Sequence, residues 1–146
     1  MGLVDTVAGQ RVYLDANIFI YALEGHVRYA AVLTDLFGAI DRGEVQAVTS
    51  ELTLAEVLVK PFADAHTERQ AAYQRALRSV GSRTVMPIDR TVLIEAARLR
   101  ATSALRLPDA IHVATARLSG CRTLISNDQR LRASAGLDVV VLAEVA

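Results

Sequence analysis

Four acidic residues stand beside or inside apolar segments, where a carboxylate is least expected. They are Asp15, after the apolar run at 12–14; Glu56, inside the stretch at 52–59; Asp109, before the segment at 110–116; and Asp128, after the strand-like run at 123–126. An isolated buried carboxylate is destabilising because it loses its hydration. Carboxylates that converge, however, provide the ligands that Mg²⁺ and Mn²⁺ prefer. The pattern predicts a divalent-metal site of the kind that hydrolyses phosphodiester bonds.

Each acid also has a purely structural explanation. Asp109 and Asp128 could cap helices or lie in their first turns, where the helix dipole favours a negative charge. Asp15 could cap the helix that follows it, and Glu56 could pair with Lys60, one helical turn further on. One shared cation explains all four acids more economically. We favour a primary site on Asp15 and Asp109, with Glu56 and Asp128 completing it or binding a second ion.

Two asparagines accompany the acids. Asn17 lies two residues after Asp15, and Asn127 directly precedes Asp128. An amide at such a position can orient a carboxylate or a bound water. A turn or a helix cap is the alternative explanation for both asparagines.

Ser50 and His112 complete the polar candidates. Ser50 precedes the helix that carries Glu56, so a helix cap is its simplest role, although its hydroxyl could also reach a phosphate or a bound water. His112 lies three residues after Asp109, on nearly the same helical face, and could bond a carboxylate or assist proton transfer. A hydrogen-bonded core histidine is the more common alternative.

Length and composition indicate one compact domain over residues 1–146. The 52% hydrophobic and 22% charged residues are typical of a globular protein. The formal net charge of zero is weak evidence against a nucleic-acid partner, although the remainder is positive once the four acids are set aside. A single cysteine, Cys121, cannot form an internal disulfide. With no signal peptide and no apolar run near the ~20 residues of a membrane span, we expect a cytoplasmic protein.

Short strand-like runs alternate with segments of helical periodicity. The runs are 11–15, 45–49, 84–87, 123–126 and 139–142. The alternation predicts an α/β fold with a mostly parallel sheet of five strands flanked by helices. Ligands of such sheets bind at the carboxyl ends of the strands, so acids far apart in the sequence can meet at one edge.

Two of the expected helices carry marked apolar stripes. One stripe is Tyr29, Leu33, Leu36, Phe37 and Ile40, and the other is Leu52, Ala55, Leu58 and Val59. Each stripe predicts a helix face that packs against other parts of the protein. Further helices are expected around 64–79, around 91–104, and from 110 to a closing Gly120, with Pro61 and Pro87 as element boundaries.

The sequence resembles the PIN domain, a nuclease fold with four acidic positions. The segments that carry the resemblance are YLDANIFIY at 13–21, SELTLAEVL at 50–58, LPDAIHVATA at 107–116 and SNDQRL at 126–131. They are most similar to the VapC toxins of prokaryotic toxin–antitoxin pairs, and the resemblance covers about residues 11–142.

This resemblance implies a Rossmann-like sheet of five parallel strands and an endoribonuclease that depends on Mg²⁺ or Mn²⁺. The family's acidic positions are filled by Asp15, Glu56, Asp109 and Asp128, and its accompanying polar position by Asn17. Family members often have Thr at the position of Ser126 and Phe at that of Leu131.

The resemblance also implies partners. These are an RNA substrate, a second copy in a homodimer, and a small cognate antitoxin that lays a helix or tail into a groove beside the site. The stripe that begins at Tyr29 is a candidate docking face, with core packing as the alternative. Two other functions stay open: a PIN nuclease with a housekeeping role in RNA processing, and a PIN-like module that binds without catalysis.

Two other acidic α/β classes do not fit. A phosphoacceptor receiver domain needs a lysine late in the chain, whereas the single lysine is Lys60. A dehalogenase-type phosphatase needs a second aspartate where Asn17 stands.

Crowded carboxylates should also affect stability. Mutual repulsion is expected to raise some of their pKa values, so that Asp109→Asn or Asp128→Asn stabilises the protein in EDTA.

Overall fold

A computed structural model describes residues 2–133 and 136–146. The elements are, in chain order, α1 (Leu3–Val7), β1 (Arg11–Leu14), α2 (Ala16–Glu24), α3 (Ala30–Asp41), β2 (Gln46–Ser50), α4 (Glu51–Ala63), α5 (Thr67–Ala76), β3 (Arg83–Met86), α6 (Arg90–Ala101), α7 (Leu107–Leu118), β4 (Thr123–Ser126), the 3₁₀ helix η1 (Gln129–Ala133), β5 (Asp138–Val141) and the 3₁₀ helix η2 (Leu142–Glu144). No helix in these two ranges is long and apolar enough to span a membrane.

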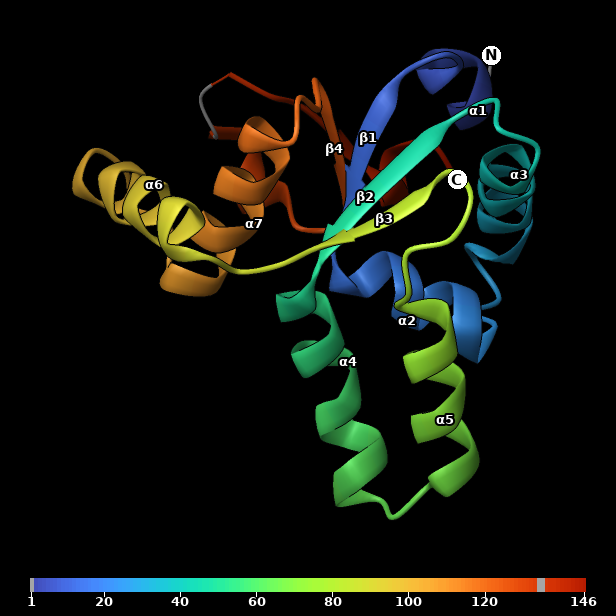
Figure 1. The fold of residues 1–146 in the computed structure, drawn as a ribbon. Helices are drawn as coiled ribbons and strands as arrows, with labels where there is room; N and C mark the ends of the chain where they lie inside the picture. Colours follow the sequence, from blue (N-terminus) through green and yellow to red (C-terminus); the bar gives the residue numbers. More distant parts are fainter. Residues whose placement is uncertain (1, 134–135) are drawn as a thin grey trace.

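All five strands form one parallel sheet in the order β3-β2-β1-β4-β5. The predicted α/β fold with a five-stranded sheet is therefore confirmed, and every strand pairing is parallel. Each strand coincides with a predicted run, apart from single-residue shifts at the ends. Parallel neighbours need long crossover connections, and the helices on the two faces of the sheet provide them (Figure 1).

The sheet separates two hydrophobic cores, because successive residues of a strand point to opposite faces. In β1, Val12 and Leu14 pack with α1, α2 and α3, whereas Tyr13 packs with α6 and α7. Figure 1 shows these two groups of helices on opposite sides of the sheet. The carboxyl ends of the central strands are therefore fixed between two packed layers.

The apolar stripe of α3 belongs to the first of these cores. Tyr29, Leu33, Leu36 and Ile40 are each at most 4% exposed, and Phe37 packs against the same cluster. The expectation that this stripe forms a docking face for a partner is therefore wrong. The physical reason is that α3 lies against α1 and α2, which cover its apolar side from within the domain.

The apolar stripe expected on α4 is not the face that this helix buries. The buried residues of α4 are Thr53, Val57 and Pro61, whereas Val59 is 67% exposed. Helices α4 and α5 pack on each other and project from the sheet as a hairpin, so neighbours cover only part of α4 (Figure 1). Phe62, which is 57% exposed, extends the uncovered apolar face of Val59.

Pro61 lies inside α4 and does not mark its boundary. A proline removes one helical hydrogen bond and usually ends a helix. Here it stands in the last turn, and its carbonyl accepts hydrogen bonds from the backbone of His66 and the side chain of Gln70. The missing hydrogen bond is thus confined to the last turn of α4. Pro87, as predicted, follows a strand directly.

The unequal burial of the two stripes predicts unequal mutational effects. Leu36→Ala should lower the free energy of unfolding by roughly 2–5 kcal/mol, because it leaves a cavity in the core. Val59→Ala should change it by less than about 0.5 kcal/mol, as is usual at the surface. Urea unfolding followed by circular dichroism measures both variants. Equal losses would show that α4 is covered in solution.

Candidate active site

The four candidate acids lie along the carboxyl-end edge of the sheet. Asp15 follows β1, and Asp128 follows the neighbouring strand β4. Glu56 lies in α4, which continues directly from β2, and Asp109 lies in the first turn of α7. The parallel strand order thus brings residues from distant parts of the sequence to one edge.

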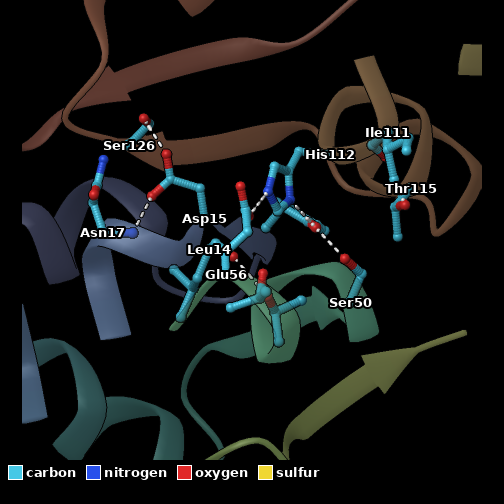
Figure 2. A network of polar contacts seen from close by, with 12 residues as sticks. Leu14, Asp15, Asn17, Ser50, Glu56, Ile111, His112, Thr115 and Ser126 are labelled. Carbon is cyan, nitrogen blue, oxygen red and sulfur yellow. Dashed lines mark hydrogen bonds and ion pairs between the residues drawn. The ribbon is translucent and has the colours of Figure 1, made fainter. Parts of the chain in front are cut away.

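Asp15 is almost completely buried, with 6% of its surface exposed. It caps α2, because one carboxylate oxygen accepts a hydrogen bond from the backbone N–H of Asn17 at 3.1 Å. The other oxygen accepts one from the hydroxyl of Ser126 on β4 (Figure 2). Loss of hydration raises the pKa of Asp15 from 3.8 to about 6, although the Ser126 bond opposes this rise. The cap explanation is confirmed, yet it leaves this charge poorly solvated.

Asp128 is held by an arginine close to it in the chain. Its carboxylate accepts hydrogen bonds from the guanidinium group of Arg130, the shortest at 2.6 Å, and from the Arg130 backbone N–H. The guanidinium bonds lower the pKa of Asp128 below its ordinary value. The backbone N–H of Asp128 donates to the hydroxyl oxygen of Ser126, which therefore links Asp128 to Asp15.

Asp109 lies beside a small pocket. The guanidinium group of Arg106 is 3.7 Å from its Oδ2. The pocket has a volume of about 210 Å³ and is lined by these two residues, by Arg130 and by residues 103–105. Two guanidinium groups thus lie next to the acids, where they could bind an anionic substrate.

Glu56 pairs with a histidine and not with a lysine. Its Oε1 lies 2.6 Å from Nε2 of His112, which is 4% exposed (Figure 2). Lys60 is exposed and forms no ion pair with Glu56 in the described part of the chain. The main alternative explanation of Glu56 is therefore wrong. The expected hydrogen bond from His112 to a carboxylate is present, whereas its role in catalysis stays a prediction.

Ser50 occupies the N-cap position of α4, but its hydroxyl does not cap the helix. It accepts a hydrogen bond from the hydroxyl of Tyr13 at 3.0 Å. The same Tyr13 hydroxyl lies 2.6 Å from Nδ1 of His112. The side-chain cap expected for Ser50 is therefore wrong, and its hydroxyl belongs to a polar network inside the core.

The side-chain amides of Asn17 and Asn127 form no hydrogen bond with the four acids in the described part of the chain. Asn17 contributes its backbone N–H to Asp15, and its amide forms no hydrogen bond with another described residue. The Nδ2 group of Asn127 donates to the hydroxyls of Tyr21 and Tyr29, and its Oδ1 accepts from a backbone N–H of η2. Asn127 thus joins the loop after β4 to other parts of the fold, and no contact supports an orienting role at the acids.

Comparison with known families identifies this architecture. The family model of the PIN domain matches residues 12–137, which is most of the chain. The chain belongs to the PIN domain family. A search among curated proteins finds no match to this PIN domain.

Solved toxin structures share the fold of this PIN domain. VapBC2 from Rickettsia felis, bound to a DNA fragment from its promoter, is 15% identical with a TM-score of 0.70, and the match covers 90% of this chain and 98% of that one. A toxin–antitoxin complex from Klebsiella pneumoniae is 26% identical with a TM-score of 0.65, covering 90% and 97%. VapC20 from Mycobacterium tuberculosis, described as a toxin that cleaves the sarcin-ricin loop, is 14% identical with a TM-score of 0.69, covering 86% and 96%.

The donor atoms of this PIN domain suit a hard divalent cation, but they are not gathered into a formed centre. Within residues 2–133 and 136–146, no three Asp, Glu, His or Cys side chains are placed to hold a metal ion. The predicted convergence is limited to a shared edge, because Asp128, Asp109 and Glu56 each contact a basic side chain of their own. Asp15 has no Arg or Lys partner among the described residues, so its buried charge is the one that a cation would neutralise.

Sequence reasoning missed the roles of Tyr13 and Ser126. In the sequence, Tyr13 belongs to the apolar run at 12–14, and Ser126 stands where family members often have Thr. Both are fully buried and lie on central strands. A buried hydroxyl needs a hydrogen-bond partner, and a polar residue in a central strand is the signal that could have pointed to this network.

The raised pKa of Asp15 predicts how stability changes with pH. This carboxyl keeps its proton up to about pH 6 in the folded protein but titrates near 3.8 when it is unperturbed. Its contribution therefore favours folding below pH 3.8 and is lost as the pH rises to about 6. Asp15→Asn keeps the cap and cannot ionise, so in EDTA at pH 7 it should be more stable than wild type by up to about 3 kcal/mol. Melting curves at pH 7 and pH 4 should show this gain shrinking at the lower pH.

Asp128→Asn is the matched control with the opposite sign. Because the Arg130 bonds lower the pKa of Asp128, its charged form favours the folded state. The melting temperature of this variant should fall slightly, which corrects the expectation that asparagine at this position stabilises the protein. A rise for Asp128→Asn, or no rise for Asp15→Asn, would contradict this account of the site.

Proposed function

We propose that this PIN domain is a divalent-metal-dependent endoribonuclease, and that it is the toxin of a VapBC-type toxin–antitoxin pair. The observation that carries the proposal is the buried carboxylate of Asp15, which shares its edge of the sheet with three further acids. A buried charge that destabilises the fold is typical of a functional site. Family membership and the likeness to VapC toxins support RNA as the substrate.

In this proposal, Asp15 and Asp109 bind a Mg²⁺ or Mn²⁺ ion, and Glu56 and Asp128 complete the site or bind a second ion. When bound, the ion supplies positive charge to phosphate oxygens and lowers the pKa of a water. Asp15 is held between the end of β1 and the start of α2, and Asp109 lies in the first turn of α7, which limits the motion of these two carboxylates.

Neighbouring side chains would then hold the acids and the RNA. Ser126 fixes the carboxylate of Asp15 from the adjacent strand. Arg106 and Arg130 line the pocket beside Asp109, where their guanidinium groups can contact phosphates of the RNA backbone.

Water is the nucleophile in this proposal, and three side chains that could compete with it, Ser50, Ser126 and Cys121, are poorly placed. Ser50 and Ser126 are 0% exposed, so their hydroxyls cannot reach a phosphate in this conformation, and the substrate contact considered for Ser50 has no support. Cys121 precedes β4, at the opposite edge of the sheet from the acids, and burial raises its pKa to about 11. A thiol with so high a pKa is protonated at neutral pH and is a weak nucleophile.

We further propose that α4 binds the antitoxin. Val59 and Phe62 form an exposed apolar face, and Val59 lies one turn after Glu56 on the same side of the helix. A segment that docks on this face would therefore reach the acidic edge. The Klebsiella pneumoniae relative was solved as a toxin–antitoxin complex, which supports a small protein as the occupant. The expected homodimer stays a prediction that light scattering can test.

The proposed chemistry predicts RNA cleavage that requires both a divalent ion and the acids. Asp15→Asn and Asp109→Asn should each lower the cleavage rate by on the order of a hundredfold or more, because a ligand of the ion is lost. The measurement is the rate at which a labelled single-stranded RNA is cleaved in MgCl₂ or MnCl₂, compared with the rate in EDTA.

Asp138→Asn provides the control, since this exposed acid begins β5 and lies at the opposite edge of the sheet. It should retain wild-type activity. Cleavage that persists in EDTA or in Asp109→Asn would exclude the metal mechanism, and wild-type protein that binds RNA without cutting it would favour a binding module. Growth arrest on expression of the wild type, absent for Asp15→Asn, separates a toxin from a housekeeping nuclease.

The partner proposal predicts that charges on α4 prevent antitoxin binding. The double variant Val59→Asp, Phe62→Asp should no longer copurify with the small protein encoded next to it, and co-expression should no longer restore growth. Ile94→Asp is the matched control, because Ile94 is similarly exposed on α6. Copurification of the double variant at the wild-type level would place the partner elsewhere.

A further inference from the structure

A chain of buried hydrogen bonds connects the central strands to Glu56. The Tyr13 hydroxyl lies 3.0 Å from Ser50 Oγ and 2.6 Å from His112 Nδ1, and His112 Nε2 lies 2.6 Å from Glu56 Oε1 (Figure 2). Tyr13 and Ser50 are 0% exposed and His112 is 4% exposed. The chain therefore crosses from β1 and β2 through α7 to the carboxylate on α4, and only its last member reaches solvent.

The hydrogens of this chain can be assigned in part from chemistry. An ionised carboxylate only accepts hydrogen bonds, so His112 Nε2 carries a hydrogen and donates it to Glu56. Burial raises the pKa of the Tyr13 phenol, which therefore keeps its hydrogen at neutral pH. That single hydrogen points either to His112 Nδ1 or to Ser50, and in both arrangements the imidazole ring is fixed from behind by Tyr13.

We infer that Tyr13 and His112 are positioning residues of the nuclease, which hold the Glu56 carboxylate in its working orientation. The inference rests on the proposed function and adds two residues to it. Neither residue touches substrate: His112 acts through Glu56, and Tyr13 acts through His112.

Glu56 needs such support because of where it lies. Its helix belongs to the projecting α4–α5 hairpin, and its side chain is 35% exposed. An unsupported glutamate at such a place samples several rotamers, and losing that freedom opposes binding and catalysis. Contacts of 2.6 Å on each side of the imidazole ring restrict this motion and tie α4 to the rigid sheet.

The test compares two replacements of His112 that fill similar space. His112→Gln can still donate from Nε2 to Glu56, whereas His112→Leu cannot donate at all. His112→Leu should lower kcat for RNA cleavage about 10–100-fold with little change in KM, because a contact that orients a ligating group is lost. His112→Gln should recover most of this loss. Equal kcat for the two variants would show that His112 only fills space, and would overturn the inference.

Tyr13→Phe tests the buried end of the chain, and Tyr73→Phe is its control. Tyr73 is equally buried and donates to the carboxylate of Glu24, away from the four acids. Tyr13→Phe loses the contacts of its hydroxyl with Ser50 and His112, whereas Tyr73→Phe loses one hydrogen bond to Glu24. Both variants should melt at a lower temperature than wild type. Only Tyr13→Phe should lower kcat, by several-fold. An unchanged kcat for Tyr13→Phe would remove Tyr13 from the inference.

Nitrogen NMR of the imidazole ring gives a readout that does not depend on activity. His112→Gln assigns the signals, and the spectrum should show a hydrogen on Nε2 that responds to Glu56→Gln, with Nδ1 responding to Tyr13→Phe. Ring nitrogen signals that do not shift in either variant would exclude this chain of hydrogen bonds. If the wild type fails to cleave RNA in Mg²⁺ or Mn²⁺, the proposed function fails as a whole. If the wild type cleaves RNA and the His112 variants have the same kcat as the wild type, only this inference fails.

Discussion

The burial of Asp15 is the constraint around which this edge of the domain is arranged. A carboxylate at the end of the central strand loses most of its hydration, and the structure offers it only neutral donors: a backbone N–H at the start of α2 and the hydroxyl of Ser126. The positive end of the α2 dipole adds to these. Together they do not offset the lost hydration, as the raised pKa shows. The fold therefore tolerates a charge that a more stable protein would lack, which is typical of sites kept for function.

The other three acids differ from Asp15 in having basic partners. Each contacts a basic side chain: Arg130 beside Asp128, Arg106 near Asp109, and His112 against Glu56 in the described part of the chain. These pairs explain how four acids share one edge without strong mutual repulsion. An ion bound by Asp109 or Asp128 would compete with Arg106 or Arg130 for the same oxygens. The affinity of the proposed site would then depend on these arginines as well as on the acids.

The sequence predicted the sheet well because each strand is an apolar run of the right length between helical segments. It could not distinguish the stripe of α3 from that of α4, since both have the same periodicity. The difference is tertiary: α3 packs against α1 and α2, whereas α4 projects with α5 from the sheet. The sequence likewise indicated which acids are candidates for the site, because an acid within an apolar segment is unusual. It did not indicate their partners, because Ser126 meets Asp15 only through the pairing of β1 with β4.

The pairing of β1 with β4 determines both which side chains are buried in the core and which residues meet at the site. In the register of β1 and β4, Leu14 lies opposite Ile125, so the next residue along β1 is Asp15 and its neighbour is Ser126. A slip of one residue would separate this pair, and it would also turn Tyr13 from the α7 side of the sheet to the other. The hydrophobic alternation that buries Val12 and Leu14 on one face is thus what aims the Tyr13 hydroxyl at His112 on the other. Packing of the β1 side chains supports this register together with the hydrogen bonds of the sheet. Core substitutions in β1 that leave every polar residue intact should therefore still disturb the geometry of the acids.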